Sequence, residues 1–383
     1  MKEYYKDTSQ DLFPSSRKEI FFYYFSKLIY EFSRFIKRKR GKDKVNVLVT
    51  APYNESGLLE LKQHFGEITY RCWKENGRAY EEEELISLLK ETKAEGIIVE
   101  LDKVTERVLA ETPKLAFIGV CRGMPSNVDV EAATKREIPV FFTPGRNAQA
   151  VAEMFVGNLI ALYRHTIQSS EWLKQENWKD DYLQAYVKFK GNEVAGKTIG
   201  MVGFGAVGQR IAAVLEGFGC AIQYYDPYVE SEDPRYKRLS LEEVFSTSDV
   251  VSIHLPRTDE TVGMINETYL SLMKEDAVLV NTSRAVVVDR EALFHTLKAG
   301  RIRGAILDVF YHEPPDESDY ELIKLPNVLA TPHLAGASYE VEDHHVAIMN
   351  QALIKWNNEQ TIEIPTIYNR RQIESSVKEE VEN

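Results

Sequence analysis

Thr198-Ile199-Gly200-Met201-Val202-Gly203-Phe204-Gly205-Ala206-Val207-Gly208 is the stretch on which the fold assignment depends. Its apolar first half predicts a buried strand, and the GxGxxG pattern that follows runs straight into a predicted helix over residues 209–218. Glycine allows a tight turn, a close approach of a pyrophosphate, and close packing of the helix on the strand. The N–H groups and the dipole of the helix start then face the phosphates. The stretch therefore predicts a dinucleotide site with contacts from Gly203, Gly205, Ala206, Val207 and Gly208.

The residue that selects between the two nicotinamide dinucleotides is expected at the end of the next strand. That strand, 221–225, ends in Asp226, which lies at about the 20-residue spacing typical of a ribose acceptor. A carboxylate there accepts hydrogen bonds from the ribose hydroxyls and repels a 2′-phosphate, so NAD is favoured over NADP. Arg235, Lys237 and Arg238 follow, and they could reach a 2′-phosphate if the loop folds back, which leaves some use of NADP open.

Short β-rich runs alternate with charged helical segments from Val45 to Ala330, a pattern typical of parallel α/β units. We predict an α/β protein with two doubly wound parallel-sheet domains, a Rossmann NAD-binding domain being inserted in a flavodoxin-like substrate-binding domain. The predicted strands are 45–49, 68–72, 96–99, 115–120 and 140–142, then 198–202, 221–225, 250–253, 277–280, 305–307 and 328–330. The expected boundaries are 45–147 and 335–365 for the substrate-binding domain and 148–334 for the NAD-binding domain.

Three segments lie outside this pattern. Residues 1–44 carry a surplus of Lys and Arg and predict an amphipathic helix, which either packs on the body or a partner subunit or anchors peripherally to acidic lipid. Residues 169–192 are rich in Trp, Lys and Asp and predict an exposed loop or arm. Residues 366–383 predict a charged, frayed tail.

Composition excludes several classes of protein. The 383-residue chain has a net charge of −12, which repels a polyphosphate backbone, so nucleic-acid binding is not expected. No segment reaches the roughly 18 to 20 uncharged apolar residues of a membrane span. Cys72, Cys121 and Cys220 lack CxxC spacing and fit a reducing compartment, so we expect a cytoplasmic protein. Adjacent His344 and His345 point about 100° apart on a helix and are poor chelators, so no metal is expected.

Reactive side chains follow three strands of the second set. Arg284, Glu313 and His333 should project from the sheet edge that also carries the glycine turn. Hydride transfer at an alcohol carbon needs a proton-exchanging group and a cation for the substrate's acid group. His333 suits the first need because imidazole titrates near neutral pH, and Glu313 would orient the ring and stabilise the imidazolium. Arg284 suits the second through a bidentate grip on a carboxylate, and Asp308 could accept a hydrogen bond from the nicotinamide amide.

The chain resembles the D-isomer-specific 2-hydroxyacid dehydrogenases over residues 45–360. The resemblance rests on the glycine motif and on Tyr225-Asp226-Pro227, His254-Leu255-Pro256, Asn281-Thr282-Ser283-Arg284, Asp308-Val309-Phe310 with Glu313-Pro314, and Thr331-Pro332-His333-Leu334-Ala335-Gly336. It implies NAD as the cofactor, Arg284, Glu313 and His333 as the catalytic residues, two lobes with the nicotinamide between them, and a homodimer joined through the cofactor lobes. It also implies cofactor contacts at His254, Leu255, Pro256, Thr282, Ser283, Asp308, His333 and Gly336. Glu313 argues against formate as the substrate, because formate dehydrogenases carry glutamine there.

One loop departs from the family pattern. A glycine-valine-glycine stretch is replaced here by Cys121-Arg122-Gly123-Met124-Pro125-Ser126, ahead of Asn127-Val128-Asp129. Family members hold the substrate carboxylate with backbone N–H groups of this loop, so substrate contacts are expected at Arg122, Gly123 and Met124. The Arg122 cation would suit a phosphate or a polyhydroxylated acid, and the alternative is a salt bridge to a neighbouring carboxylate.

We therefore expect an NAD-dependent oxidoreductase that interconverts a small D-2-hydroxy acid and its 2-oxo acid. One alternative is D-3-phosphoglycerate dehydrogenase proper, although there is no room after Asn357 for the regulatory domain that this enzyme often carries. The other alternative is a non-catalytic NAD(H)-sensing protein that resembles the corepressors sharing this fold, with residues 1–44 as its partner-binding addition.

Overall fold

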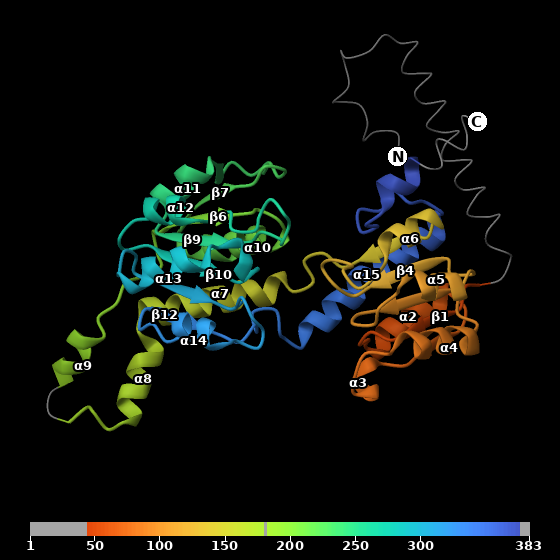
Figure 1. Cartoon of the computed structure of the whole chain (residues 1–383), viewed down its shortest axis with the longest axis horizontal. Helices are drawn as coiled ribbons and strands as arrows, with labels where there is room; N and C mark the ends of the chain where they lie inside the picture. The colour runs from red at the N-terminus through yellow and green to blue at the C-terminus, as the bar shows by residue number, and fades with distance from the viewer. Residues whose placement is uncertain (1–43, 180–181, 376–383) are drawn as a thin grey trace, which may run out of the picture. The chain divides into compact units, whose positions relative to one another are not determined.

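The computed structural model describes residues 44–179 and 182–375, which form two compact units (Figure 1). Unit 1 contains residues 44–146 and 342–375, and unit 2 contains residues 147–341, so unit 2 is inserted in the sequence of unit 1. The second crossing lies at Val341, beyond the expected boundary at residue 334, because Ala335 is buried in the core of unit 2. The expected N-terminal amphipathic helix falls outside the described residues.

Unit 1 is built on a five-stranded parallel sheet in the order β2-β1-β3-β4-β5. The strands β1, β3 and β4 are buried at every position, as expected for a parallel sheet that is covered on both faces. The strands are β1 (Val47–Val49), β2 (Ile68–Tyr70), β3 (Gly96–Val99), β4 (Phe117–Val120) and β5 (Val140–Phe142), and the helices are α2 (Glu55–His64), α3 (Trp73–Asn76), α4 (Glu82–Thr92), α5 (Glu106–Glu111), α6 (Val130–Lys135) and α15 (Glu340–Glu359).

Two apolar clusters fill the two faces of this sheet. One contains Leu61 of α2 and Leu353 of α15, and the other contains Leu85 of α4. Phe117 and Trp356 pack edge to face with ring centroids 5.4 Å apart. The helix α15 thus joins the core of the sheet formed by the first part of the chain.

The segment after Pro365, which we expected to be frayed, is packed on unit 1 as far as residue 375. Asn369 is fully buried, its Oδ1 accepts a hydrogen bond from the N–H of Val140 at 2.9 Å, and its Nδ2 donates to the carbonyl of Ile138 at 3.0 Å. Ile367 and Ile373 are buried in the same core as α15. The expectation was wrong here because two isoleucines and one asparagine are a weak signal within a charged sequence.

Unit 2 is built on a seven-stranded parallel sheet in the order β12-β11-β10-β9-β6-β7-β8. Six of these strands were predicted, and the edge strand β8 was not, because its three residues carry polar, largely exposed side chains. The strands are β6 (Thr198–Val202), β7 (Ala221–Tyr225), β8 (Tyr236–Arg238), β9 (Val250–Ile253), β10 (Val278–Asn281), β11 (Gly304–Leu307) and β12 (Val328–Ala330).

Helices cover both faces of the unit 2 sheet. α7 and α10 contribute to one apolar cluster, and α11, α12 and α13 contribute to the other. The helices are α7 (Ala148–Tyr163), α10 (Ala206–Leu215), α11 (Leu241–Thr247), α12 (Glu267–Leu272), α13 (Arg290–Lys298) and α14 (Glu317–Ile323), with one-turn helices η1 (Glu216–Phe218) and η2 (Ala285–Val287).

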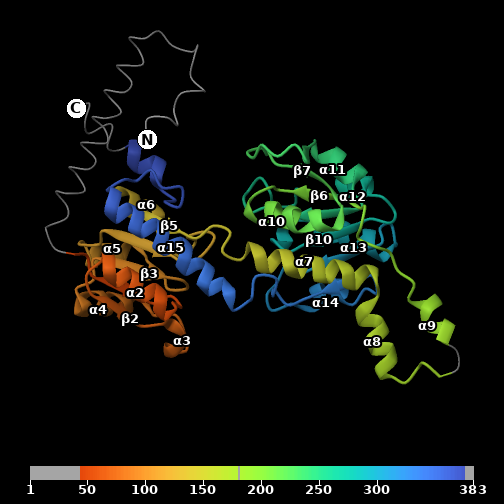
Figure 2. The ribbon, with the colours of Figure 1, turned by 180° about the vertical axis from the view of Figure 1, so that it is seen from behind.

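The segment expected to be an exposed loop or arm contains two helices, α8 (Thr166–Lys174) and α9 (Tyr182–Lys188). Both extend away from the body of unit 2 (Figures 1 and 2). Trp172 of α8 packs edge to face on Phe189, the residue that directly follows α9, with ring centroids 5.5 Å apart. None of the helices in residues 44–179 and 182–375 is long and apolar enough to cross a membrane.

Asn369→Ala should lower the free energy of unfolding by about 2 kcal/mol, because it leaves two buried backbone groups without partners. Urea denaturation measures the effect, and Asn358→Ala on the exposed side of α15 is the matched control. Equal stability of the two variants would contradict the packed tail.

Candidate active site

In the glycine turn after β6, Gly203 and Gly208 have no room for a side chain, whereas Gly205 does. Gly203 has a φ of +92°, and a Cβ there would lie 2.8 Å from the carbonyl oxygen of His254. A Cβ on Gly208 would lie 2.7 Å from the carbonyl oxygen of Gly203, whereas one on Gly205 would meet no described atom within 4 Å. The first and third glycines therefore permit close packing, and the second leaves room beside the start of α10. This shape fits a pyrophosphate.

Asp226 is tied to the glycine turn by hydrogen bonds. Its Oδ2 accepts from the N–H of Phe204 at 2.7 Å, and its Oδ1 accepts from the N–H groups of Tyr228 and Val229 at 2.8 and 2.9 Å. Each carboxylate oxygen can accept further hydrogen bonds, so the group still fits the ribose hydroxyls of NAD.

Two of the three basic residues beyond Asp226 have hydrogen-bond or ion-pair partners of different kinds. Arg235 is paired with Asp233 and Glu216. Arg238 lies on β8, and its Nη2 donates to the carbonyl oxygens of Asp226 and Pro227 at 2.8 and 3.2 Å. The pairing of β8 with β7 therefore brings Arg238, rather than Arg235, to the ribose end of the site.

Among the buried polar atoms that have no hydrogen-bond partner in the described residues, two lie at strand ends of unit 2: His254 Nε2 after β9 and Thr282 Oγ1 after β10. Burial lowers the pKa of His254 to about 4, so its ring is neutral at physiological pH. Buried polar groups are nearly always satisfied, so these two atoms fit a site that a polar ligand completes.

The remaining predicted cofactor residues occupy the same strand ends. Leu255 is buried and Pro256 exposed after β9, and Ala206 and Val207 begin α10. Ser283 is held by Asn281, whose Oδ1 accepts from its N–H and hydroxyl at 3.0 Å each. A Cβ on Gly336 would lie 2.5 Å from Nδ2 of Asn147, so a side chain there would displace that amide group.

Asp308 holds the turn that carries His333. Its side chain is 1% exposed. Its Oδ1 accepts from the hydroxyl of Thr331 at 2.6 Å and the N–H of Leu334 at 2.8 Å, and its Oδ2 accepts from the N–H of Ala335 at 2.8 Å. The sequence did not reveal this structural role, and the expected contact of Asp308 with the nicotinamide amide stays a prediction.

His333 and Glu313 lie together at the ends of β12 and β11. Nδ1 of His333 is 2.8 Å from Oε2 of Glu313, and Oε1 of the glutamate accepts from the N–H of Phe310 at 3.2 Å. An ionised carboxylate only accepts hydrogen bonds, so Nδ1 carries a proton and Nε2 is the atom left for exchange. The imidazole is 50% exposed, so a small molecule can reach it.

Arg284 follows β10 in an extended conformation. Its carbonyl oxygen accepts from Nδ2 of Asn281 at 3.0 Å, and its Nη1 donates to the carbonyl of Ser283 at 2.6 Å. Its exposed guanidinium has no carboxylate partner in the part of the chain that the structure describes. This cation is therefore available to an anionic ligand.

Arg122 belongs to unit 1 and follows β4. Its carbonyl oxygen accepts from the N–H of Thr143 at 2.9 Å. Its guanidinium forms no ion pair with any carboxylate of residues 44–179 and 182–375, in contrast to the alternative considered from the sequence. Gly123 and Met124 next to it are exposed.

The two adjacent histidines of α15 are used inside unit 1. Nε2 of His345 lies 2.7 Å from the carbonyl oxygen of Pro52, and Nδ1 lies 3.0 Å from Nη1 of Arg146. Nδ1 of His344 lies 3.1 Å from the carbonyl oxygen of Arg146.

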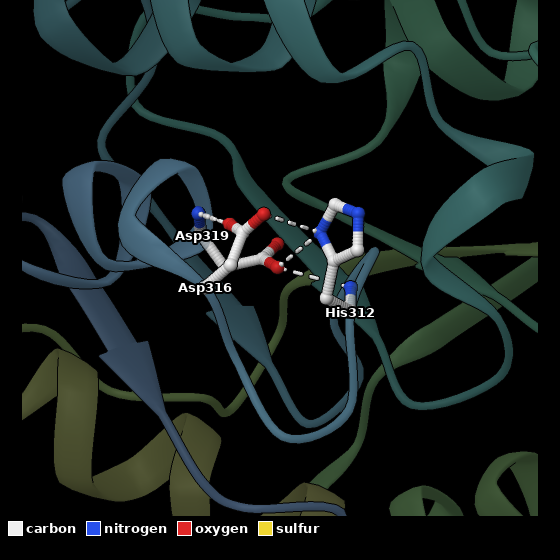
Figure 3. A group of neighbouring side chains, drawn as sticks. All are labelled: His312, Asp316 and Asp319. Atoms are coloured by element: carbon white, nitrogen blue, oxygen red, sulfur yellow. Dashed lines mark hydrogen bonds and ion pairs between the residues drawn. The ribbon is translucent and has the colours of Figure 1, made fainter.

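A cluster not anticipated from the sequence, His312 with Asp316 and Asp319, lies beside Glu313 in unit 2 (Figure 3).

Known proteins resemble this chain over both units. The model of the NAD-binding domain of D-isomer-specific 2-hydroxyacid dehydrogenases matches residues 156–335. A Bacillus subtilis (strain 168) protein named as a 2-hydroxyacid dehydrogenase, YoaD, is 66% identical over 332 residues, which are 87% of this chain and 96% of that protein. The glyoxylate reductase of Thermococcus litoralis is 36% identical over 81% of this chain and 93% of its own length.

Among solved structures, D-lactate dehydrogenase from Aquifex aeolicus in complex with NAD and lactic acid is similar, with a TM-score of 0.62 and 27% identity. The similarity covers 83% of this chain and 98% of that chain. Because the likeness in sequence and fold extends across both units, the chain belongs to the family of D-isomer-specific 2-hydroxyacid dehydrogenases and is an NAD-dependent oxidoreductase.

Proposed function

We propose that this protein interconverts a small D-2-hydroxy acid and its 2-oxo acid. The observation that carries the proposal is the 2.8 Å contact between Nδ1 of His333 and Oε2 of Glu313, which leaves Nε2 of an accessible ring for proton exchange. Among the described residues the exposed guanidinium of Arg284 donates only to the backbone of Ser283, which supports its role as the cation for the substrate carboxylate.

The roles of the three side chains follow from their chemistry. The glycine turn and Asp226 would hold NADH, which when bound would supply the hydride for the carbonyl carbon of the 2-oxo acid. Nε2 of His333 gives its proton to the carbonyl oxygen, which becomes the hydroxyl, and Glu313 stabilises the imidazolium before that transfer. Arg284 holds the substrate carboxylate through two parallel N–H bonds and so orients the carbonyl. In the oxidative direction the neutral imidazole accepts the hydroxyl proton.

His333→Ala should lower kcat by about 10²- to 10⁴-fold, because it removes the proton-exchanging group and leaves the cofactor site intact. The measurement is NADH oxidation with glyoxylate, hydroxypyruvate, pyruvate and 3-phosphohydroxypyruvate, together with NADH binding. His295→Ala on the exposed side of α13 is the matched control. Full turnover in His333→Ala would contradict the assignment. NADH binding by the wild type without turnover of any acid would favour the NAD(H)-sensing alternative.

We further propose that Arg122 binds a second polar group of the substrate, so that phosphorylated or polyhydroxylated acids are preferred over the smallest ones. The absence of an ion pair to Arg122 in residues 44–179 and 182–375 supports this role. The similarity to a glyoxylate reductase favours the opposite preference, for the smallest 2-oxo acids. A comparison of glyoxylate with 3-phosphohydroxypyruvate therefore tests the proposal.

Arg122→Gln should raise KM for 3-phosphohydroxypyruvate by about tenfold, the value of one charge-assisted hydrogen bond, and should change KM for glyoxylate much less. Glyoxylate serves as the internal control because it has no second polar group. Equal changes for both acids would rule out a role of Arg122 in substrate choice.

We also propose a homodimer that uses the arm formed by α8 and α9. Leu173, Tyr186 and Val187 of the arm are 55 to 71% exposed. A shallow, mainly apolar groove of about 550 Å³ lies between α7 and α8, and a second copy of the arm is its proposed occupant. The lining residues are Gly157, Ile160, Ala161, Thr166, Ile167, Ser170 and Glu171.

Leu173→Glu should shift the protein from dimer to monomer, because it places a charge within the apolar surface of the arm. Sedimentation velocity measures the change. Leu59→Glu on α2 is the matched control, since Leu59 is exposed to nearly the same extent, 56%. A monomeric wild type, or a dimer that survives Leu173→Glu, would exclude the arm as the interface.

A further inference from the structure

The segment between Asp308 and Asp319 connects the loops that carry the three proposed catalytic residues. Asp308 binds the turn of His333, and Glu313 binds His333 itself. Two further side chains of this segment, Tyr311 and Asp319, make hydrogen bonds that no catalytic role accounts for. We infer that both are positioning residues: Tyr311 fixes the turn after Arg284, and Asp319 fixes the backbone that presents Glu313. The inference rests on the proposed function.

Tyr311 reaches across to the loop of Arg284. Its hydroxyl donates to the carbonyl oxygen of Val288 at 2.6 Å. Val288 is 1% exposed and directly follows η2, the single helical turn that begins right after Arg284. Burial raises the pKa of Tyr311 well above its ordinary value, so the hydroxyl keeps its proton and remains a donor. The bond therefore holds the residue that follows η2, and Arg284 is the residue that precedes η2.

Asp319 holds the backbone on the other side of the segment. Its carboxylate is fully buried. Oδ1 accepts from the N–H of Tyr311 at 3.1 Å, and Oδ2 accepts from the N–H of His312 at 2.9 Å. The N–H of Phe310 binds Oε1 of Glu313. Three consecutive amides thus bind two carboxylates, and the next residue along the chain is Glu313.

The side chains around Asp319 strengthen this arrangement (Figure 3). Nδ1 of His312 lies 3.1 Å from Oδ2 of Asp319 and 3.0 Å from Oδ2 of Asp316. Asp316 also caps α14 by accepting from the N–H of Asp319 at 3.0 Å. The three residues have the composition of a metal site, but both oxygens of Asp319 already accept backbone hydrogen bonds. The cluster is thus accounted for as the anchor of the loop.

The two residues should affect different kinetic constants. Tyr311→Phe leaves the buried carbonyl of Val288 without its donor, loosens the Arg284 turn, and should raise KM for the 2-oxo acid about tenfold while kcat stays within about twofold. Asp319→Asn replaces one acceptor oxygen by an NH₂ group facing a backbone N–H. It should lower kcat about 10- to 100-fold with KM within about twofold, because Glu313 no longer aligns with His333.

Matched variants separate positioning from a general loss of stability. Tyr320→Phe removes a hydroxyl from an exposed tyrosine of α14. Asp276→Asn makes the same change of charge as Asp319→Asn at a side chain that is 93% exposed, in the loop before β10 and outside the segment between Asp308 and Asp319. Both controls should retain the wild-type kcat and KM, and thermal unfolding is followed for all four variants.

Binding of oxamate, an unreactive isostere of pyruvate, to the NADH complex tests the role of Tyr311 without any turnover. Oxamate affinity should fall in Tyr311→Phe and in Arg284→Lys, and it should persist in Asp319→Asn. The inference is overturned if Tyr311→Phe binds oxamate as the wild type does, or if both variants lower kcat and raise KM to the same extent. Failure of the proposed function is distinct, because it appears as unchanged turnover in His333→Ala.

Discussion

The geometry of the candidate active site depends on one buried carboxylate, that of Asp308. A buried ion without hydrogen-bond donors costs several kcal/mol, so the three donors that surround it constrain the chain strongly. They all come from residues 331–335, and the turn adopts a conformation in which they point inward. His333 lies within that turn and has a φ of +52°. Residues other than glycine adopt such a left-handed backbone conformation only where the surrounding structure imposes it. Asp308 thereby fixes the backbone from which the imidazole meets Glu313.

Carboxylates that bind backbone amides recur throughout this site. Asp226 accepts from three N–H groups beside the glycine turn, Glu313 accepts from Phe310, and Asp319 accepts from two more. Loops at the ends of strands leave amides that the sheet does not use, and a carboxylate oxygen satisfies them more strongly than a neutral acceptor. The carboxylate proposed to bind the cofactor ribose and the carboxylate that contacts the imidazole therefore also shape the loops. Mutations in them will combine structural and chemical effects.

The parallel sheet of unit 2 supplies the common edge on which these loops assemble. The neighbours β10, β11 and β12 run in parallel register, so Arg284, Asp308 and Thr331 leave the sheet at the same end. β6, β7 and β9 bring the glycine turn, Asp226 and His254 to that end as well. Because all these strands are parallel, their carboxyl ends lie at one edge of the sheet, and the glycine turn and the proposed catalytic residues share that edge.

The order of amino acids was sufficient for the fold class, eleven strand positions, the glycine turn and the reactive residues at strand ends. These features are local: a run of apolar residues forms a strand, and a glycine is needed where a Cβ would collide, as at Gly203. Other features arise when distant segments meet. The edge strand β8, the packed residues 366–375, and the bonds from Asp308 and Tyr311 depend on partners in other segments of the chain. A hydrogen bond across such a distance leaves no periodic pattern in either segment, so its existence is settled by packing.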